Sequence, residues 1–338
     1  MSTCKHSSWL KLRRKGAQVV LEASDRPQRL MKEIDNVDDP LGTVLLIGSE
    51  TKDLMRKTLF ANRGIPETRA RHSECHSYFS RLPDENPVLV FDGGLPNHNR
   101  LPVSCKPHSC HEVATEIMVG VVPRAIDAVN EMYSRIVVPL VNVVCIFVAD
   151  NGGMGNTLQH LKIWAARGRK SPSSISPALL LVVPKGQESE AALTLSSVLE
   201  QVGPESLSWY FQSVRMVSLP NGTNKVRQCH LVRKELLLLI KEVQTVNRQS
   251  GRLFSALHVT EFLRAAANAA TSPGQEHFDL IKASRKDLPL SEDLRHHLLR
   301  FLAVYDDSKM LEHTLPLIAS SFILDQYPPG MHRRHLYN

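Results

Sequence analysis

The chain has 338 residues, 42% of them hydrophobic, and a formal net charge of +7, which is typical of a globular protein with a core. Its longest apolar run, 136–149, is shorter than the roughly 20 residues that a membrane-spanning helix needs, so no transmembrane segment is expected. The basic residues form small groups without interleaved aromatic side chains, which argues against nucleic acid as a partner.

The N-terminus and the cysteines indicate an intracellular protein. The first residues, MSTCKHSSWLKLRRKG, are polar and basic and include no apolar segment of signal-peptide length. Six cysteines without regular spacing fit reduced thiols better than a disulfide framework. We therefore expect an intracellular location, with the cytoplasm favoured over the nucleus.

The first 249 residues divide into an arm and an α/β domain. Residues 1–40 carry many charges and little periodic hydrophobicity, so we expect a partly ordered basic arm there. From residue 41 to 249, apolar runs alternate with amphipathic stretches, as in parallel strands joined by crossover helices. The expected strands are 44–47, 88–91, 142–149, 178–183 and 214–219, and a polar stretch is expected at 64–86. The expected helices follow the first strand and the DNGGMG sequence and also lie at about 112–134, 188–201 and 226–246. This order predicts a three-layer, P-loop NTPase-like domain with a doubly wound parallel sheet.

Beyond Gly251 the strand signals stop and helical stripes follow. One stripe runs from Val259 to Ala270, a second from Leu294 to Tyr305, and a third from Ile318 to Ile323. We expect a C-terminal helical module at 250–327, packed on the α/β domain, and a tail at 328–338.

The sequence from Gly42 to Phe60, GTVLLIGSETKDLMRKTLF, predicts a strand, a tight loop and a helix. The helix N-terminus directs free backbone N–H groups at whatever lies above the strand, most often a phosphate. After Gly48, however, a phosphate loop's Gly-Lys-Ser/Thr positions are held by Lys52, Asp53 and Leu54. A Lys57-Thr58 pair follows about one helical turn too late. The loop is therefore a degenerate form of the phosphate-binding motif.

Two aspartates close later strands at the same expected edge of the sheet. Asp92 ends the VLVFD run, in the form of a carboxylate that holds Mg²⁺, although a strand-ending Asp is also a common turn former. Asp150 begins DNGG, which matches the Asp-x-x-Gly sensor of a γ-phosphate but follows a later strand than that motif normally does. A glycine-rich turn into a helix is the better interpretation of DNGG. No Asn-Lys-x-Asp sequence follows Val183, so guanine specificity is not indicated.

A group of cysteines and histidines offers an alternative site. Tetrahedral zinc takes such ligands, but the spacings match no strong finger pattern, and loop histidines with buried cysteines are the simpler interpretation. The candidate ligands are His72, Cys75, His76, Cys105, His108, Cys110 and His111.

The chain resembles the GTPase-like, degenerate P-loop module of large fungal multidomain proteins, some of which carry a following patatin-like phospholipase domain. The resemblance is carried by IFVADNGGMGNTLQHLKIWAARG, by RLFSALH and by SFILDQYPPGMHRRHLY, and would cover residues 40 to 337. The resemblance implies the fold of this module, but none of the matching stretches is a catalytic motif. No Gly-x-Ser-x-Gly motif is present, so no lipase activity is implied.

Three functional hypotheses remain open. The first is a regulatory or interaction module with weak or absent nucleotide hydrolysis, working through protein partners that the sequence does not identify. The second is an active NTPase in which Lys52, or Lys57 and Thr58, replace the usual residues, and the third is a zinc-stabilised interaction domain. No catalytic residue is assigned, and the candidate cofactor is a magnesium nucleotide (Mg-nucleotide). The candidate nucleotide-binding residues are Gly48, Ser49, Lys52, Lys57, Thr58 and Asp92.

Overall fold

The chain divides into two compact units, 1–278 and 279–338. The structure is a computed structural model. It describes residues 7–15, 18–34, 39–59, 73–80, 87–96, 115–119, 124–167, 176–199, 207–220 and 224–250, together with parts of 253–266, 293–303 and 312–321.

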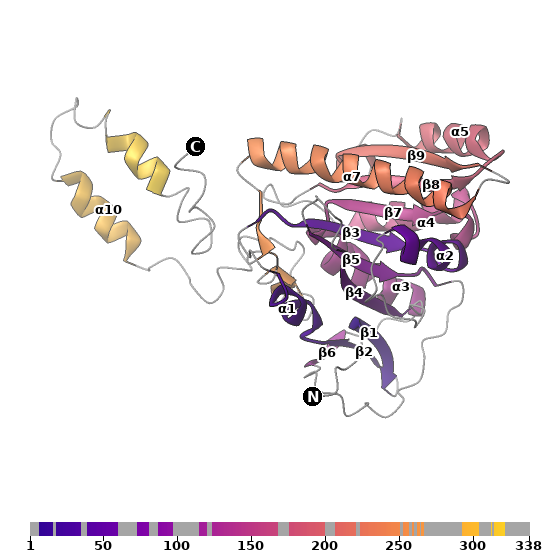
Figure 1. The fold of residues 1–338 in the computed structure, drawn as a ribbon. Helices are drawn as coiled ribbons and strands as arrows, with labels where there is room; N and C mark the ends of the chain where they lie inside the picture. The colour runs from indigo at the N-terminus through magenta and orange to yellow at the C-terminus, as the bar shows by residue number, and fades with distance from the viewer. Residues whose placement is uncertain are drawn as a thin grey trace. The chain divides into compact units, whose positions relative to one another are not determined.

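The described part of the first unit holds one nine-stranded sheet in the order β6-β2-β1-β4-β5-β3-β7-β8-β9 (Figure 1). The strands are β1 (Ser8–Lys15), β2 (Gln18–Ala23), β3 (Gly42–Ile47), β4 (Glu74–Ser80), β5 (Val88–Gly93), β6 (Thr115–Val119), β7 (Val143–Phe147), β8 (Ala178–Pro184) and β9 (Ser213–Leu219). Strands β5, β3, β7, β8 and β9 are parallel neighbours, whereas β4, β1, β2 and β6 join antiparallel. The predicted α/β class is therefore confirmed, but the sheet is mixed and not wholly parallel.

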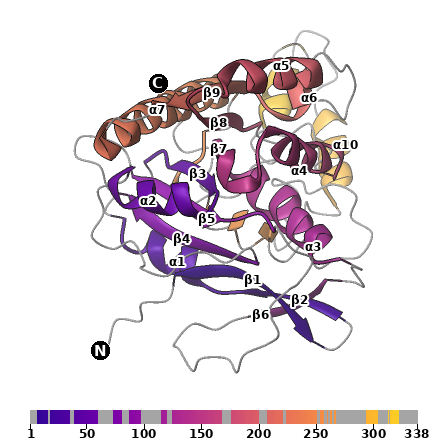
Figure 2. The same cartoon turned by 90° about the vertical axis from the view of Figure 1, so that its right-hand side faces the viewer.

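Helices cover both faces of the sheet, as a three-layer arrangement requires. The helices of the first unit are α1 (Arg26–Met31), α2 (Glu50–Leu59), α3 (Ala125–Glu131), α4 (Met154–Arg167), α5 (Glu188–Leu199), α6 (Leu207–Tyr210) and α7 (Lys225–Gln249), and a π-helix (Met132–Val137) continues α3. Figure 2 shows α2 and α7 on one side of the sheet and α3, α4, α5 and α6 on the other, in agreement with their mutual contacts. Every residue of β3, β5 and β7 is buried, and such two-sided burial produces the continuous apolar runs in the sequence.

Part of the N-terminal segment 1–40, which was expected to be a partly ordered arm, forms two strands of the sheet. Strands β1 and β2 form a hairpin, and β1 pairs with β4. Trp9, Leu10 and Leu12 are buried in β1 despite the basic residues around them. Of the charged residues that suggested an arm, Arg13 is half-buried and pairs with Glu22 at 2.9 Å, and Arg14 and Lys15 are exposed at the end of β1.

Two strands of the sheet, β4 and β6, were not predicted from the sequence, and both were missed for the same reason. Strand β4 lies within 64–86, which was expected to be only a polar stretch, and β6 lies at Thr115–Val119, inside the expected helix 112–134. Both strands are antiparallel additions whose pairing is made with distant residues: β4 with β1 and β5, and β6 with β2. Local periodicity does not report such long-range pairing.

The described segments after Gly251 fall into both units. Phe254, Val259, Phe262 and Leu263 are buried in the first unit, and the backbone near Ser255 bridges to Pro40. The second unit contains α10 (Leu294–Ala303), none of whose residues is buried, and a helical stretch at 314–321. The expected helical module at 250–327 is thus divided, its packing on the first unit stays a prediction, and the tail 328–338 lies outside the described residues. Among the described helices, none combines the length and apolarity that a membrane crossing requires.

Removing the side chain of Trp9 tests whether the N-terminal hairpin belongs to the core. Its ring is 2% exposed and lies 5.0 Å from the ring of Phe91 in β5. We expect Trp9→Ala to lower the free energy of unfolding by about 3–5 kcal/mol, measured by chemical denaturation. The exposed Arg14 on the same strand supplies the control, and equal stabilities of Trp9→Ala and Arg14→Ala would show that the hairpin is not part of the core.

Candidate functional site

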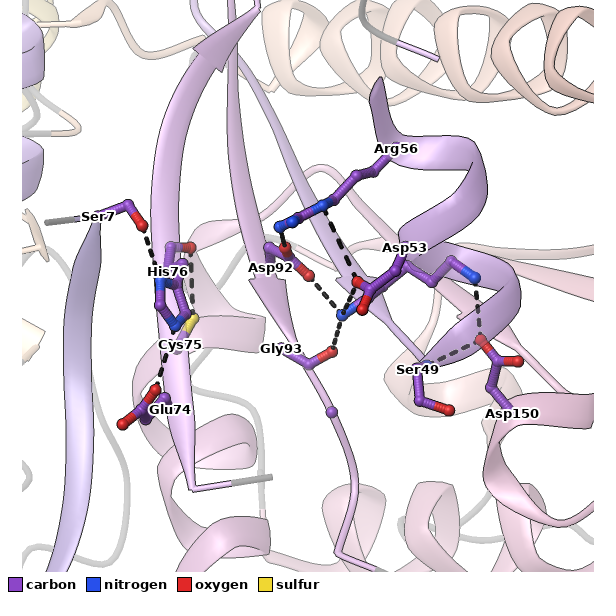
Figure 3. A network of polar contacts seen from close by, with 12 residues as sticks. Ser7, Ser49, Asp53, Arg56, Glu74, Cys75, His76, Asp92, Gly93 and Asp150 are labelled. Atoms are coloured by element: carbon purple, nitrogen blue, oxygen red, sulfur yellow. Dashed lines mark hydrogen bonds and ion pairs between the residues drawn. The ribbon is translucent and has the colours of Figure 1, made fainter. Parts of the chain in front are cut away.

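The loop between β3 and α2 is short and its backbone N–H groups converge on one carboxylate. The N–H group of Ser49 donates to Oδ2 of Asp150 at 2.8 Å (Figure 3). The N–H group of Lys52 donates to the same oxygen at 3.0 Å, and that of Thr51 donates to Oδ1 at 3.0 Å. These donors form the first turn of α2, which is where a helix binds an anion. The carboxylate of Asp150 therefore occupies the position that a phosphate would need.

The chain after β7 places Asp150 at this position. A 3₁₀ turn (Ala149–Asn151) follows the strand, and the Asn151 side chain donates to the carbonyl of Phe147 at 3.0 Å. Gly152 and Gly153 have φ of 79° and 95°, left-handed values that glycine adopts without strain. The DNGG sequence is thus the glycine-rich turn into α4 that was predicted. Its aspartate has an additional role that the sequence analysis did not identify.

Gly48 is required by the closeness of the two loops. A Cβ atom at this position would lie 2.7 Å from Oδ2 of Asp150 and 2.9 Å from Cβ of Lys52. Both distances are shorter than van der Waals contact. Glycine here therefore serves the approach of an internal carboxylate, which accounts for its presence without any bound nucleotide.

Lys52 points into the protein and ends on the neighbouring strand. Its Nζ lies 2.5 Å from Oδ1 of Asp92 and 2.7 Å from the carbonyl oxygen of Gly93. Arg56, one turn further along α2, places Nη1 2.6 Å from Oδ2 of Asp92. Lys52 and Asp92 are fully buried and Arg56 is 2% exposed. The Asp92 carboxylate thus has a cation beside each of its oxygens.

The predicted nucleotide-binding residues separate into two groups. Gly48, Ser49, Lys52 and Asp92 are brought together, with Lys52 and Asp92 paired to each other. Thr58 is exposed near the end of α2, seven residues beyond Thr51 and hence about 10 Å further along the helix axis. The backbone of Lys57 belongs to the same distal turn. Thr58 therefore does not lie at the loop, and the side chain of Lys57 is outside the described part of the structure.

Sequence reasoning missed Arg56 and the role of Asp150. The spacing of Lys52 and Arg56 is the i,i+4 spacing that puts both cations on one helix face, so it was an available signal for a buried acidic partner. The Asp150 interaction joins residues about a hundred positions apart, and only the sheet order shows that it forms.

The candidate zinc ligands lie partly outside the described residues: His72, Cys105, His108, Cys110 and His111 are not described. Cys75 and His76 are neighbours on β4, so their side chains point to opposite faces of the sheet. Burial raises the pKa of the Cys75 thiol, which opposes the thiolate that zinc needs. Among the described residues there is no group of three metal-ligating side chains.

His76 belongs to a second polar cluster, which joins β1 to β4. Its Nδ1 lies 2.8 Å from Oγ of Ser7, and its Nε2 lies 3.3 Å from Oε2 of Glu74 (Figure 3). Glu74 also pairs with Lys11 at 2.6 Å. Burial alone would raise the pKa of Glu74, but the hydrogen bonds from His76 and Lys11 outweigh it and lower the pKa to about 2. Lys11 lies on β1 and Ser7 directly before it, whereas Glu74 and His76 lie on β4, so the cluster holds the hairpin to the sheet.

Neither a protein-family model nor a curated protein matches this chain. Among solved structures, it is similar to a GTP-binding protein from the hyperthermophilic archaeon Sulfolobus solfataricus in complex with GDP, with a TM-score of 0.32 and 13% sequence identity. The similarity covers 64% of this chain and 57% of that one, so the chain spans little more than half of the archaeal protein. A similarity of this degree assigns neither a ligand nor an activity.

Replacing Asp150 should expose the loop amides. Three N–H groups lose a charged acceptor in Asp150→Ala, so we expect the free energy of unfolding to fall by about 2–3 kcal/mol. Inorganic phosphate should then raise the melting temperature of the variant more than that of the wild type, because only the variant has free amides. Asp150→Asn, which keeps an acceptor oxygen without the charge, should be intermediate. Identical responses of wild type and Asp150→Ala to phosphate would contradict the occupancy described here.

The lowered pKa of Glu74 predicts a pH dependence of stability. A carboxyl with a depressed folded-state pKa stabilises the fold above its unfolded-state value of about 4.5, and that stabilisation is lost as the pH falls toward about 2. We expect Glu74→Gln to lower stability by about 1–3 kcal/mol at neutral pH and to flatten the fall of stability with acid. Glu190→Gln, at an exposed position of α5, is the matched control. Parallel pH profiles of wild type and Glu74→Gln would disprove the assignment.

Proposed function

We propose that this chain is a GTPase-like module derived from a phosphate-loop protein, which acts by binding protein partners and does not hydrolyse nucleotide. The observation that carries the proposal is the Asp150 carboxylate on the N–H groups of the β3–α2 loop. An anion that belongs to the fold competes with the phosphates of any nucleotide at the one position where the helix N-terminus would bind them.

The charges around the loop support the same proposal. Phosphoryl transfer depends on a lysine placed against phosphate oxygens and on Mg²⁺ held by a hydroxyl and a carboxylate. Here Lys52 pairs with the Asp92 carboxylate and donates to the carbonyl of Gly93, and Arg56 pairs with the other oxygen of Asp92. Binding a metal nucleotide would require breaking this buried ion cluster, and removing one partner of such a pair typically costs about 3–5 kcal/mol.

The short length of the β3–α2 loop also supports the proposal. A phosphate loop wraps several glycine-flanked N–H groups around the phosphates, whereas Gly48 and Ser49 alone separate β3 from α2. Asp53 adds another carboxylate, 3.8 Å from Nζ of Lys52. The active-NTPase hypothesis would need Lys57 and Thr58, about two helical turns away, to reach the same phosphates. The regulatory role and the relationship to fungal multidomain proteins remain parts of the proposal.

A nucleotide titration of the whole chain tests the proposal. We expect neither Mg-GTP nor Mg-ATP to raise the melting temperature of the wild type, whereas a ligand at about 100 times its dissociation constant would add about 2.7 kcal/mol of stability. Hydrolysis of both nucleotides should equal the protein-free background. Turnover in the wild type that disappears in Lys57→Ala or Thr58→Ala would establish the active-NTPase alternative and overturn the proposal.

A further inference from the structure

Strand β9 is at the end of the sheet opposite β6. It pairs with β8 in continuous register from Ser213 to Leu219, and in the described part of the chain it has no other strand neighbour. Residues 213–218 are all half-buried, unlike the fully buried strands at the centre. The backbone groups that do not face β8 therefore point outward, which is the arrangement to which an additional strand can pair.

The usual protections of an edge strand are missing from β9. The strand is seven residues long, its register with β8 has no bulge, and it contains neither proline nor lysine. Its one charged side chain, Arg215, is turned toward α7, where it pairs with Glu242 at 2.6 Å and with Glu235 at 3.4 Å. Arg215 therefore does not repel an approaching strand.

Helix α7 packs beside β9 along this edge of the sheet. Gln228 donates to the carbonyl of Pro220 at the end of β9, and Glu235 and Glu242 contact Arg215. These three α7 residues are spaced by seven, so they share one face of the helix, and Leu231 and Leu238 lie between them on that face. Leu238 is 41% exposed. Val217, two residues after Arg215, faces the same side of the sheet.

We define the β9 edge surface as Arg215, Val217, Leu231, Glu235, Leu238 and Glu242. It offers apolar side chains, a free strand edge and two carboxylates that share one guanidinium. The net charge of this surface is therefore negative by one.

The negative net charge of this surface favours a partner with positively charged side chains. A second copy of the chain, pairing antiparallel through β9, would bring together two β9 edge surfaces that each have this negative net charge. Like charges in that position oppose self-association. An extended segment with lysine or arginine at alternate positions has the complementary charge, and its apolar residues would meet Val217, Leu231 and Leu238.

We propose that the β9 edge surface binds an extended basic peptide segment of a partner protein as an added strand. Backbone hydrogen bonds to β9 provide the affinity common to strand addition, and the carboxylates of Glu235 and Glu242 select basic side chains. This inference goes beyond the proposed function, because it identifies the binding surface and the chemistry of the partner. It does not depend on whether nucleotide binds.

The experiment uses the full chain and three fluorescein-labelled peptides measured by fluorescence anisotropy. The first alternates valine with lysine, the second has glutamate in place of lysine, and the third is the first with an N-methyl group on every residue. We expect the basic peptide to bind, the acidic peptide to bind at least about tenfold more weakly, and the N-methylated peptide to lose binding, because it has no N–H group to donate to β9 from either edge. Amide hydrogen exchange in β9 should slow only when the basic peptide is present.

Substitutions at Glu242 and at a control position test whether the peptide binds at the β9 edge surface. Glu242→Lys should weaken binding of the basic peptide by about tenfold or more, and Glu242→Gln by less, while both retain the wild-type circular dichroism spectrum. Glu190→Lys, an equal charge change on the exposed side of α5, should leave binding unchanged. The proposal is overturned if the basic peptide does not bind at about 1 mM, if the acidic or N-methylated peptide binds equally well, or if Glu242→Lys binds like the wild type. Self-association of the wild type through β9, detected by sedimentation, would overturn it as well.

Discussion

The hydrogen bonds from the first turn of α2 to the Asp150 carboxylate are the interaction on which the organisation of this site depends. They join the carboxyl ends of β3 and β7, two neighbouring parallel strands, and they satisfy N–H groups that a helix cannot pair by itself. Hydrogen bonds to a charged group are stronger than those between neutral groups, so this cluster contributes substantially to the stability of the site. The short loop and the glycine at position 48 follow from the same contact.

The buried ion cluster under α2 explains why this helix keeps its position. Lys52 and Arg56 project from adjacent turns onto Asp92 at the end of β5. Burying three charges is costly, and it is tolerated because each charge has a close partner of opposite sign. A lysine that reaches inward in this way is unavailable to a ligand above the loop. The helix is thus fixed to β7 through its backbone and to β5 through its side chains.

The two ends of the sheet differ in a way that bears on function. At one end the N-terminal hairpin and β6 extend the sheet by antiparallel pairing, and Ser7, His76, Glu74 and Lys11 fix the junction between β1 and β4. At the other end β9 is half-exposed and has α7 beside it. The N–H groups at the loop are paired within the protein, whereas the exposed β9 edge retains the capacity to form new backbone hydrogen bonds.

The amino-acid sequence by itself determined the α/β class and the central parallel strands. Strands buried on both faces must be apolar throughout, and amphipathic helices must repeat with their own period, so β3, β5, β7, β8 and β9 and the helices α5 and α7 could be located from local pattern. It also showed that Lys52, Asp53 and Leu54 depart from the phosphate-loop pattern, because that motif is local.

Only the tertiary structure decided what happens at that loop and where the sheet ends. The polar sequence of β4 becomes a strand because β1 and β5 supply its hydrogen-bond partners. Thr115–Val119 becomes β6 because β2 lies beside it. Asp150 lies about a hundred residues from the amides that it accepts, and whether a carboxylate at a strand end serves a metal, a turn or a neighbouring helix depends on which strands are adjacent. Sheet order brings these residues together, and no local spacing in the sequence encodes it.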